Sequence, residues 1–423
     1  MQTMSLFQRV HLVVLRRQQF RNCSSQHRQW AKEQIERFDY KVGVEKASTP
    51  PTTWYTDQRF YEFEQKALFP SNFWAGESLH LLEEPQSFAT TKIANEPYLL
   101  VNNNGSVNGF FNVCRHHGTK VEWKECGKKE LFSCPYHGWT YNGEGRLVKA
   151  TRLRGIENFN TKCNGLERID LFELWPMVFV KPRRNCESPF HSEEIMNRNA
   201  RRIHRKLAEV GLDLPSSGNN NNNHKALQHV GRRHYDLKCN WKIFVDNYLD
   251  GGYHVQYAHK DLSNLLNSRS YKSESFFTRT EKEHELIYQW SVQTSKGTDG
   301  DSRVGDKVAY FHLFPNVMLN FYGPWLDVNY VIPTGAQTCR VIFDWFADAS
   351  FLNKCDQQKR LEMINENIAN SDKVQQEDIE LCEMVQEGNQ SSSYVQGRYA
   401  PKVEKPMFDF HTRLFLEYQN YLK

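Results

Sequence analysis

The sequence has no long apolar run, no strong net charge and no dense group of cysteines. With 423 residues and 39% apolar content it can bury a large core, but no stretch approaches the roughly 20 apolar residues of a membrane-spanning helix. The formal charge of +4 is small for this length and gives little support to nucleic-acid binding. The ten cysteines are scattered, which is typical of reduced thiols in an intracellular compartment. We therefore expect a globular protein without a membrane span or a nucleic-acid partner.

Acidic residues are absent from the first 32 residues, which carry six arginines and lysines. Removing these six charges from the total of +4 leaves −2 for the remainder of the chain. An Arg-rich segment that lacks acids and contains Ser24 and Ser25 is typical of an organelle transit peptide. Residues 1–32 therefore predict targeting to a mitochondrion or plastid, and the alternative is the basic tail of a cytoplasmic protein. Residues 33–53 are predicted to be a linker, with order beginning near Trp54.

The rest of the chain predicts an α+β protein. Short β-rich runs between Asn-Gly and Gly-rich turns predict a small antiparallel domain over residues 85–185, preceded by a helical part over 54–84 that belongs to the second domain. The second domain is predicted over 186–423. A polar tract at 216–224 is predicted to be a loop. The elements expected after it are a helical segment around 240–260, strands around 308–346 and a long helix around 356–388.

Two short segments, "CRHH" and "CPYH", each combine thiol and imidazole groups and supply Cys114 with His116 and Cys134 with His137. Zinc sites of the finger type group their cysteines and histidines in separate pairs, which this pattern does not do. A Rieske [2Fe-2S] centre has two cysteines on one iron and two histidines on the other, and two mixed loops supply that set. The spacing therefore predicts a Rieske cluster that relays single electrons, with structural zinc as the alternative.

A second pair of histidines, His254 and His259, lies in "DNYLDGGYHVQYAH". Five residues correspond to about 140° on a regular helix, so the helix is expected to end or loosen between them. Asp250 lies four residues before His254, and the two glycines between them weaken regular helical geometry. Two histidines beside carboxylates indicate a mononuclear metal site. Iron(II) oxygenases generally hold their metal with two histidines and one carboxylate.

The predicted long helix offers the carboxylate. Asp378 shares an apolar stripe with positions three, four and seven residues away, and a buried carboxylate needs a cation or a hydrogen-bond partner. We therefore predict Asp378 as the third metal ligand, with Glu383 as the next candidate. Glu377 and Glu380 fall off the stripe and are expected to be solvated.

These motifs, together with "YGPW", "EDIELCEMVQEG" and "GRYAP", resemble the Rieske non-haem iron oxygenase family, and within it the choline monooxygenase-like branch. The resemblance runs from about Trp54 to the C-terminus. It implies a Rieske antiparallel β domain, a helix-grip catalytic domain on a large antiparallel sheet, and a [2Fe-2S] cluster with a mononuclear Fe(II). It also implies a homotrimer in which electrons cross between subunits, and a ferredoxin or flavin reductase as electron donor.

The sequence departs from many relatives at the acid that bridges the two metal sites. That acid lies three residues before the first iron histidine in those relatives, and here the position is Gly251. Asp250 or Asp246 is predicted to take the role, with Asp250 preferred.

The substrate implied by the resemblance is a quaternary ammonium compound, most readily choline. Carnitine, glycine betaine and proline betaine are alternatives. Aromatic faces attract such cations, and Tyr257, Tyr322 and Trp325 are the predicted cage. A protein of another class, a Rieske electron carrier without oxygenase activity, is a further alternative.

Overall fold

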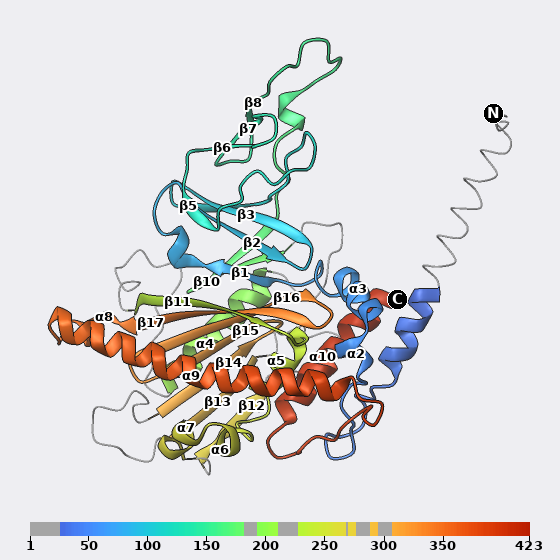
Figure 1. The fold of residues 1–423 in the computed structure, drawn as a ribbon, viewed down its shortest axis with the longest axis vertical. Coiled ribbons are helices and arrows are strands. Elements are labelled where there is room, and N and C mark those ends of the chain that lie inside the picture. Colours follow the sequence, from blue (N-terminus) through green and yellow to red (C-terminus); the bar gives the residue numbers. More distant parts are fainter. Residues whose placement is uncertain (1–25, 182–192, 210–226, 268–269, 276–287, 295–306) are drawn as a thin grey trace.

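The structure is a computed structural model that describes residues 26–181, 193–209, 227–267, 270–275, 288–294 and 307–423 (Figure 1). The polar tract predicted as a loop at 216–224 and most of the predicted transit peptide lie outside these residues. In the described part of the chain, no helix combines the length and apolar character needed to cross a membrane.

The upper part of the molecule in Figure 1 consists of short antiparallel strands. One sheet has the order β4-β3-β2-β5 and another the order β6-β7-β8. A separate apolar core fills this part, and Cys114 and Cys134 belong to it. The strands are β2 (Ser87–Ile93), β3 (Glu96–Asn103), β4 (Ser106–Phe111), β5 (Cys126–Lys128), β6 (Leu131–Ser133), β7 (Thr140–Asn142) and β8 (Leu147–Lys149).

A third small sheet, β1-β10-β9, joins this part to the rest of the molecule. Strand β1 (Trp74–Ser78) pairs antiparallel with β10 (Met177–Lys181), which pairs with β9 (Asp170–Leu174). The predicted boundary at residue 85 is therefore too late, because β1 pairs with strands that close the β domain about 100 residues later. Its side chains, including Trp74, pack into the main core.

The lower part contains one seven-stranded antiparallel sheet of order β11-β17-β16-β15-β14-β13-β12. This is the large sheet that the predicted fold class requires. Its central strands are buried on both faces, so apolar residues lie on both faces instead of alternating with exposed polar ones, and the polar residues Asn320, Asp327, Asn329 and Asp344 are buried among them. The strands are β11 (Leu227–Leu237), β12 (Lys272–Ser275), β13 (Tyr288–Thr294), β14 (Lys307–Leu313), β15 (Val317–Tyr322), β16 (Trp325–Gly335) and β17 (Thr338–Asp348).

Helices cover this sheet, and α9 (Gln357–Asn389) runs across one face of it (Figure 1). Asp356 caps α9 by accepting from the amide of Lys359, and Asn240 caps α5 by accepting from the amide of Lys242. The remaining helices are α2 (Thr53–Thr56), α3 (Gln58–Ala67), α4 (Glu193–Glu209), α5 (Trp241–Tyr248), α6 (Val255–Ala258), α7 (Lys260–Leu265), α8 (Ala349–Leu352) and α10 (Lys405–Leu422), with 3-10 turns at Leu79–Leu82 and Thr161–Cys163.

The predicted linker differs from the structure. Residues 26–36 form a helix, and Ile35, Phe38 and Ala47 are at most 1% exposed within the main core. Arg28 donates to the carbonyl of Leu422, so this segment also contacts the end of α10. The segment that was predicted to be a linker from its Pro/Thr content is therefore an integral part of the lower domain. The described structure starts at residue 26, well before the predicted start near Trp54.

Candidate metal centres and active-site cavity

The two Cys/His segments form matching loops. In each loop the amide of a glycine donates to the carbonyl of the cysteine four residues earlier, Gly118 to Cys114 and Gly138 to Cys134, at 3.0 Å in both. These glycines have φ values of +75° and +72°, a region in which residues with a Cβ are strained. The spacing that the sequence shows twice therefore produces the same turn twice.

The loops separate thiols from imidazoles. The Cys114 and Cys134 side chains are buried, whereas His116 and His137 are exposed at the tip with ring centroids 4.7 Å apart. The Cys114 sulfur lies 3.3 Å from the hydroxyl of Tyr141, an additional polar partner for a sulfur ligand. Two inner thiols and two outer imidazoles are the donor set that a Rieske cluster requires, one pair for each iron.

The second site lies at the break between α5 and α6. Gly251 and Gly252 have φ values of +74° and +70°, and a Cβ on Gly251 would lie 2.5 Å from the carbonyl oxygen of Val403. The helix therefore ends before His254, and this residue and His259 occupy the two ends of the single turn α6. The predicted loosening is present, although its main break precedes both histidines rather than falling between them.

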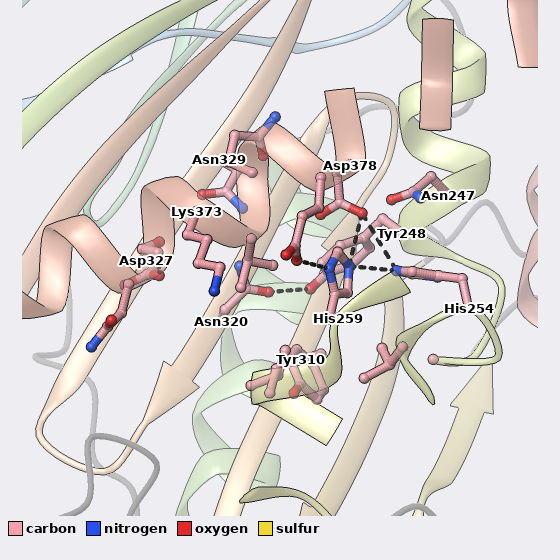
Figure 2. A pocket seen from close by; sticks show the side chains of 18 of the residues that line it. Asn247, Tyr248, His254, His259, Tyr310, Asn320, Asp327, Asn329, Lys373 and Asp378 are labelled. Carbon is pink, nitrogen blue, oxygen red and sulfur yellow. Dashed lines mark hydrogen bonds and ion pairs between the residues drawn. The ribbon is translucent and has the colours of Figure 1, made fainter. Parts of the chain in front are cut away.

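Asp378 of α9 meets the two histidines (Figure 2). The Nε2 atoms of His254 and His259 are 3.1 Å apart, and the Asp378 Oδ1 atom lies 3.1 Å from His259 Nε2 and 3.4 Å from His254 Nε2. The two rings are nearly perpendicular, at 81°. The structure thus brings together the three side chains that the sequence predicts as metal ligands.

These distances fit one divalent ion. With bonds of about 2.1 Å, two ligand atoms at right angles around a metal are about 3.0 Å apart, and at tetrahedral angles about 3.4 Å. The three measured separations fall at these values. An ion held by these three atoms would keep further coordination positions free for oxygen, as in the non-haem iron(II) oxygenases.

Each histidine also has a carboxylate behind it. The Nδ1 atom of His254 lies 2.6 Å from Asp250 Oδ2, and the Nδ1 atom of His259 lies 2.7 Å from Glu377 Oε2. Donation from Nδ1 leaves the Nε2 lone pair directed at the metal position. Glu377 was predicted to be solvated without a role, but its side chain is only partly exposed, at 32%, and contacts His259. No local sequence signal marks this pair, which spans 118 residues.

The charges of the metal-free site are strongly coupled. Burial opposes a charge on His254, but the hydrogen bonds and charges of Asp250 and Asp378 outweigh it and raise its pKa to about 10. Burial likewise opposes a charge on Asp378, yet its two histidine partners lower its pKa. A cation is therefore favoured where the three ligand atoms meet.

Two other acids from the sequence analysis lie elsewhere. Asp246 accepts from the Tyr55 hydroxyl at 2.9 Å and lies 2.8 Å from His411 Nε2, so it does not contact the triad. Glu383 accepts from the amide of Lys238 and is not part of the His254, His259 and Asp378 group. Of the two predicted bridging acids, only Asp250 contacts a triad histidine.

A cavity of about 260 Å³ opens beside the triad. Figure 2 shows Asp327 on the side opposite His254, with Tyr310 and Asn320 between them. The lining contains six aromatic rings: Phe244, Tyr248, Tyr271, Tyr310, Tyr322 and Phe343. It also contains four carboxylates, Asp261, Asp327, Glu377 and Asp378, and among the described lining residues one lysine, Lys373, which pairs with Asp261.

The predicted aromatic cage needs correction. Tyr322 lines the cavity, but Tyr257 and Trp325 do not. Tyr257 is 71% exposed on the outer surface of α6. Trp325 lies on the same side of β16 as Asp327 but at the start of the strand, where it packs against Phe351. The rings that replace them come from α5, from the segment before β12 and from the sheet, which only the tertiary fold brings together.

Comparison with known proteins assigns the family. Residues 74–160 match the Rieske [2Fe-2S] domain family, and residues 224–416 match the family described as the ring hydroxylating alpha subunit catalytic domain. The chloroplastic choline monooxygenase of Arabidopsis thaliana is 38% identical over 90% of this chain and 85% of its own length. That of Spinacia oleracea is 32% identical over 89% and 80%. The carnitine monooxygenase oxygenase subunit of Escherichia coli K12 is 26% identical over 84% and 88%.

Solved structures share the fold. A quaternary ammonium Rieske monooxygenase in complex with L-carnitine superimposes with a TM-score of 0.68 at 22% identity, covering 89% of this chain and 97% of that one. A naphthalene 1,2-dioxygenase variant gives 0.66 at 15% identity, covering 90% and 98%. The chain therefore belongs to the Rieske non-haem iron monooxygenase family, whose cofactors are a [2Fe-2S] cluster and a mononuclear iron.

Proposed function

We propose that this protein hydroxylates choline at its alcohol carbon and so forms betaine aldehyde hydrate. One oxygen atom of O2 enters the C–H bond and the other leaves as water, with two electrons and two protons consumed. The observation that carries the proposal is the cavity beside the triad, whose described lining has six aromatic rings and four carboxylates but one lysine. Its similarity to plant choline monooxygenases supports the same substrate.

The cavity suits a small cation. Its volume of about 260 Å³ is below the roughly 300–1,000 Å³ of pockets for drug-sized ligands. Aromatic faces attract quaternary ammonium groups, and the attraction grows when the ring and the cation are shielded from water. Asp327 is 2% exposed and accepts from the Ser371 hydroxyl at 2.8 Å, which holds one carboxylate on the side away from the triad. When the trimethylammonium group of choline lies near Asp327, its alcohol end points toward the triad.

The polar groups of the cavity favour an alcohol over a second charged group. Asn329 and Gln375 line the cavity, and the buried Asn329 Oδ1 and Gln375 Nε2 atoms have no hydrogen-bond partner among the described residues. Buried polar atoms are normally paired, and a hydroxyl can donate to the first and accept from the second. The carboxylate of carnitine or a betaine cannot donate, and Lys373, the one lysine among the described lining residues, is already paired with Asp261.

We assign His254, His259 and Asp378 as the iron ligands, and Asp250 and Glu377 as the acids that orient the two imidazoles. Iron bound there supplies the oxygen activation that the hydroxylation needs. The protein side chains hold the substrate cation, direct the Nε2 lone pairs and place the alcohol carbon beside the open face of the triad. The side-chain distances described above support these roles.

We assign Cys114, His116, Cys134 and His137 as the cluster ligands, fed by a ferredoxin or flavin reductase. In Figure 1 the loops around β6 and β7 lie at the top of the chain, and α6 lies at the opposite end. This separation and the exposure of the two loop histidines support electron transfer between subunits of a homotrimer. Asp250, which already accepts from one triad imidazole, is the preferred bridge, and Asp246 is the alternative. Targeting to an organelle by the N-terminal leader is part of the same proposal, and because residues 26–36 form a helix of the lower domain, the leader proposed for removal ends before residue 26 rather than at residue 32.

A substrate panel tests the proposed function. The holoprotein is supplied with reductase, ferredoxin and O2, and kcat/KM is compared for choline, L-carnitine, glycine betaine and proline betaine by product mass. Choline is expected to be converted most efficiently. A higher kcat/KM for carnitine would overturn the choline assignment, and oxidation of the cluster without product from any of the four would favour the electron-carrier alternative.

Asp327→Asn tests the role of the cavity charge. A carboxylate about 8 Å from a bound cation contributes about 2 kcal/mol at an effective dielectric constant of about 20. KM for choline is therefore expected to rise roughly thirtyfold. The matched control is Asp261→Asn, whose side chain also lines the cavity but is 75% exposed and paired with Lys373. Equal KM values in the two variants would contradict a cation-binding role for Asp327.

A further inference from the structure

Three thiols that the proposed reaction does not use meet in the core. Cys239 precedes α5, Cys339 lies on β17 and Cys382 lies on α9, and their exposed fractions are 0%, 1% and 1%. The sulfur atoms of Cys239 and Cys339 are 3.8 Å apart, and Cys382 lies close enough to Cys239 to lower the pKa of its thiol. All three are free cysteines. Cys239 is thus the centre of a cluster of thiols drawn from three distant parts of the chain.

A second cavity reaches from one member of this cluster to the metal site. It measures about 300 Å³, and its lining includes Cys382, Asp250 and His254. His254 and Asn247 also line the substrate cavity, so the two cavities adjoin beside the triad. Cys382 lies four residues after Asp378 on α9 and therefore on the same side of the helix.

We propose that the Cys239 cluster is a peroxide-reactive modification site, in which hydrogen peroxide converts Cys239 and Cys382 into a disulfide. The oxidant is the hydrogen peroxide that forms when the iron site reduces O2 without hydroxylating substrate, and this source rests on the proposed monooxygenase function. Cys239 is buried and does not line the cavity, so peroxide reaches its sulfur only when the Cys382 side chain rotates about its Cα–Cβ bond.

The chemistry balances with one peroxide molecule. The Cys239 thiolate attacks an oxygen of hydrogen peroxide, the S–O bond forms, the O–O bond breaks, and the departing hydroxide takes the proton of Cys382 to become water. The Cys382 thiolate then attacks the Cys239 sulfur. The S–S bond forms, and the second hydroxide leaves as water with the proton that Cys239 had released. Two thiols and one peroxide thus give one disulfide and two waters.

The environment of the cluster supports Cys239 as the attacking sulfur. Hydrogen bonds from Cys339 and Cys382 lower the pKa of Cys239, whereas the contact with Cys239 and burial raise the pKa of Cys382. The thiolate is the reactive form of cysteine. The resulting disulfide joins α9, which carries Asp378, to the corner before α5, which leads to His254. Oxidation therefore acts on the spacing of the triad.

Peptide mapping tests the proposal in two arms. In the first, reduced holoprotein receives hydrogen peroxide, is denatured in an alkylating agent and is digested with trypsin. The second arm replaces added peroxide with reductase, ferredoxin and O2 in the absence of substrate, with and without catalase. Both arms are expected to yield peptide 239–242 linked to peptide 374–398, with loss of alkylated Cys239 and Cys382. Catalase is expected to prevent the link in the second arm, and dithiothreitol to reverse it in both.

Variants and internal controls make each outcome decisive. Cys382→Ser should abolish this link, while Cys355→Ser, a change at a partly buried cysteine outside the cluster, should keep it. The exposed thiols of Cys126 and Cys163 report that peroxide was active. Oxidation of those two with Cys239 and Cys382 fully alkylated overturns the proposal. A link with added peroxide but none during turnover keeps the modification site and overturns the proposed source of peroxide, leaving the hydroxylase function untouched.

Discussion

Glu377 provides a sharp test of how the iron site is built, because its proposed role depends on one contact. The His259 Nδ1 atom lies 2.7 Å from Glu377 Oε2, and Glu377→Gln keeps an acceptor there but removes its charge. Losing such a partner behind a metal-binding histidine costs about 10–100-fold in metal affinity, or about 1.4–2.8 kcal/mol. The Glu377 side chain is 32% exposed, and solvent screening places the expected loss near the lower end, about tenfold.

The assay is an anaerobic competition for Fe(II) between the cluster-containing protein and a chromophoric chelator. Glu380→Gln is the matched control, because it makes the same change three residues along α9 at an exposed position without a triad contact. The control should keep the parent affinity. Equal affinities in Glu377→Gln, the control and the parent would refute the argument that Glu377 supports His259.

Three further predictions concern the two metal centres. Cys134→Ser should abolish the EPR signal of the reduced cluster while iron stays at the triad, because the cluster loops have their own core; an intact cluster signal would contradict the ligand assignment. Since His254 in the metal-free protein has a pKa raised from 6.5 to about 10, its proton stabilises the fold fully below pH 6.5, and that stabilisation is lost as pH rises through 10. Burial opposes a charge on His259, but Asp378 and Glu377 raise its pKa too. Metal must displace the histidine protons, so Fe(II) affinity should rise at least about tenfold per pH unit between pH 7 and 9, and a flat profile would count against the coupling. Asp250→Asn should slow oxidation of the cluster by the iron site in single turnover, and a parent rate in that variant with a reduced rate in Asp246→Asn would move the bridge to Asp246.

Local spacing predicted the parts of the sites that depend on short segments. Each cluster loop is a turn of five residues that starts at its cysteine, so the proposed ligands Cys114 and Cys134 begin matching turns, as the repeated spacing in the sequence predicts. Asp378 followed from helical periodicity, because burial of a carboxylate on an apolar stripe implies a cationic partner. These inferences need no knowledge of distant residues.

Contacts between distant segments could not be predicted from the sequence. Helical periodicity indicates which face of a helix is buried, but not which distant residues contact it. It therefore could not show that His259 contacts Glu377 beside the apolar stripe. Trp325 and Tyr322 are equally aromatic neighbours in sequence, but only the position of α8 decides that Trp325 packs against Phe351 and Tyr322 faces the cavity. The segment around Phe38 was predicted to be a linker from its Pro/Thr content, because its aromatic partners Phe408 and Phe415 lie about 370 residues later in α10.

The account's central claim is that the triad and its cavity together hydroxylate the alcohol carbon of choline. The most direct measurement is a single turnover of the fully reduced protein with choline that carries two deuterium atoms on the alcohol carbon, followed by product mass. The account predicts betaine aldehyde that retains one deuterium, formed in proportion to the iron at the triad. Recovery of choline with both deuterium atoms, while the cluster is oxidised and O2 is consumed, would contradict it.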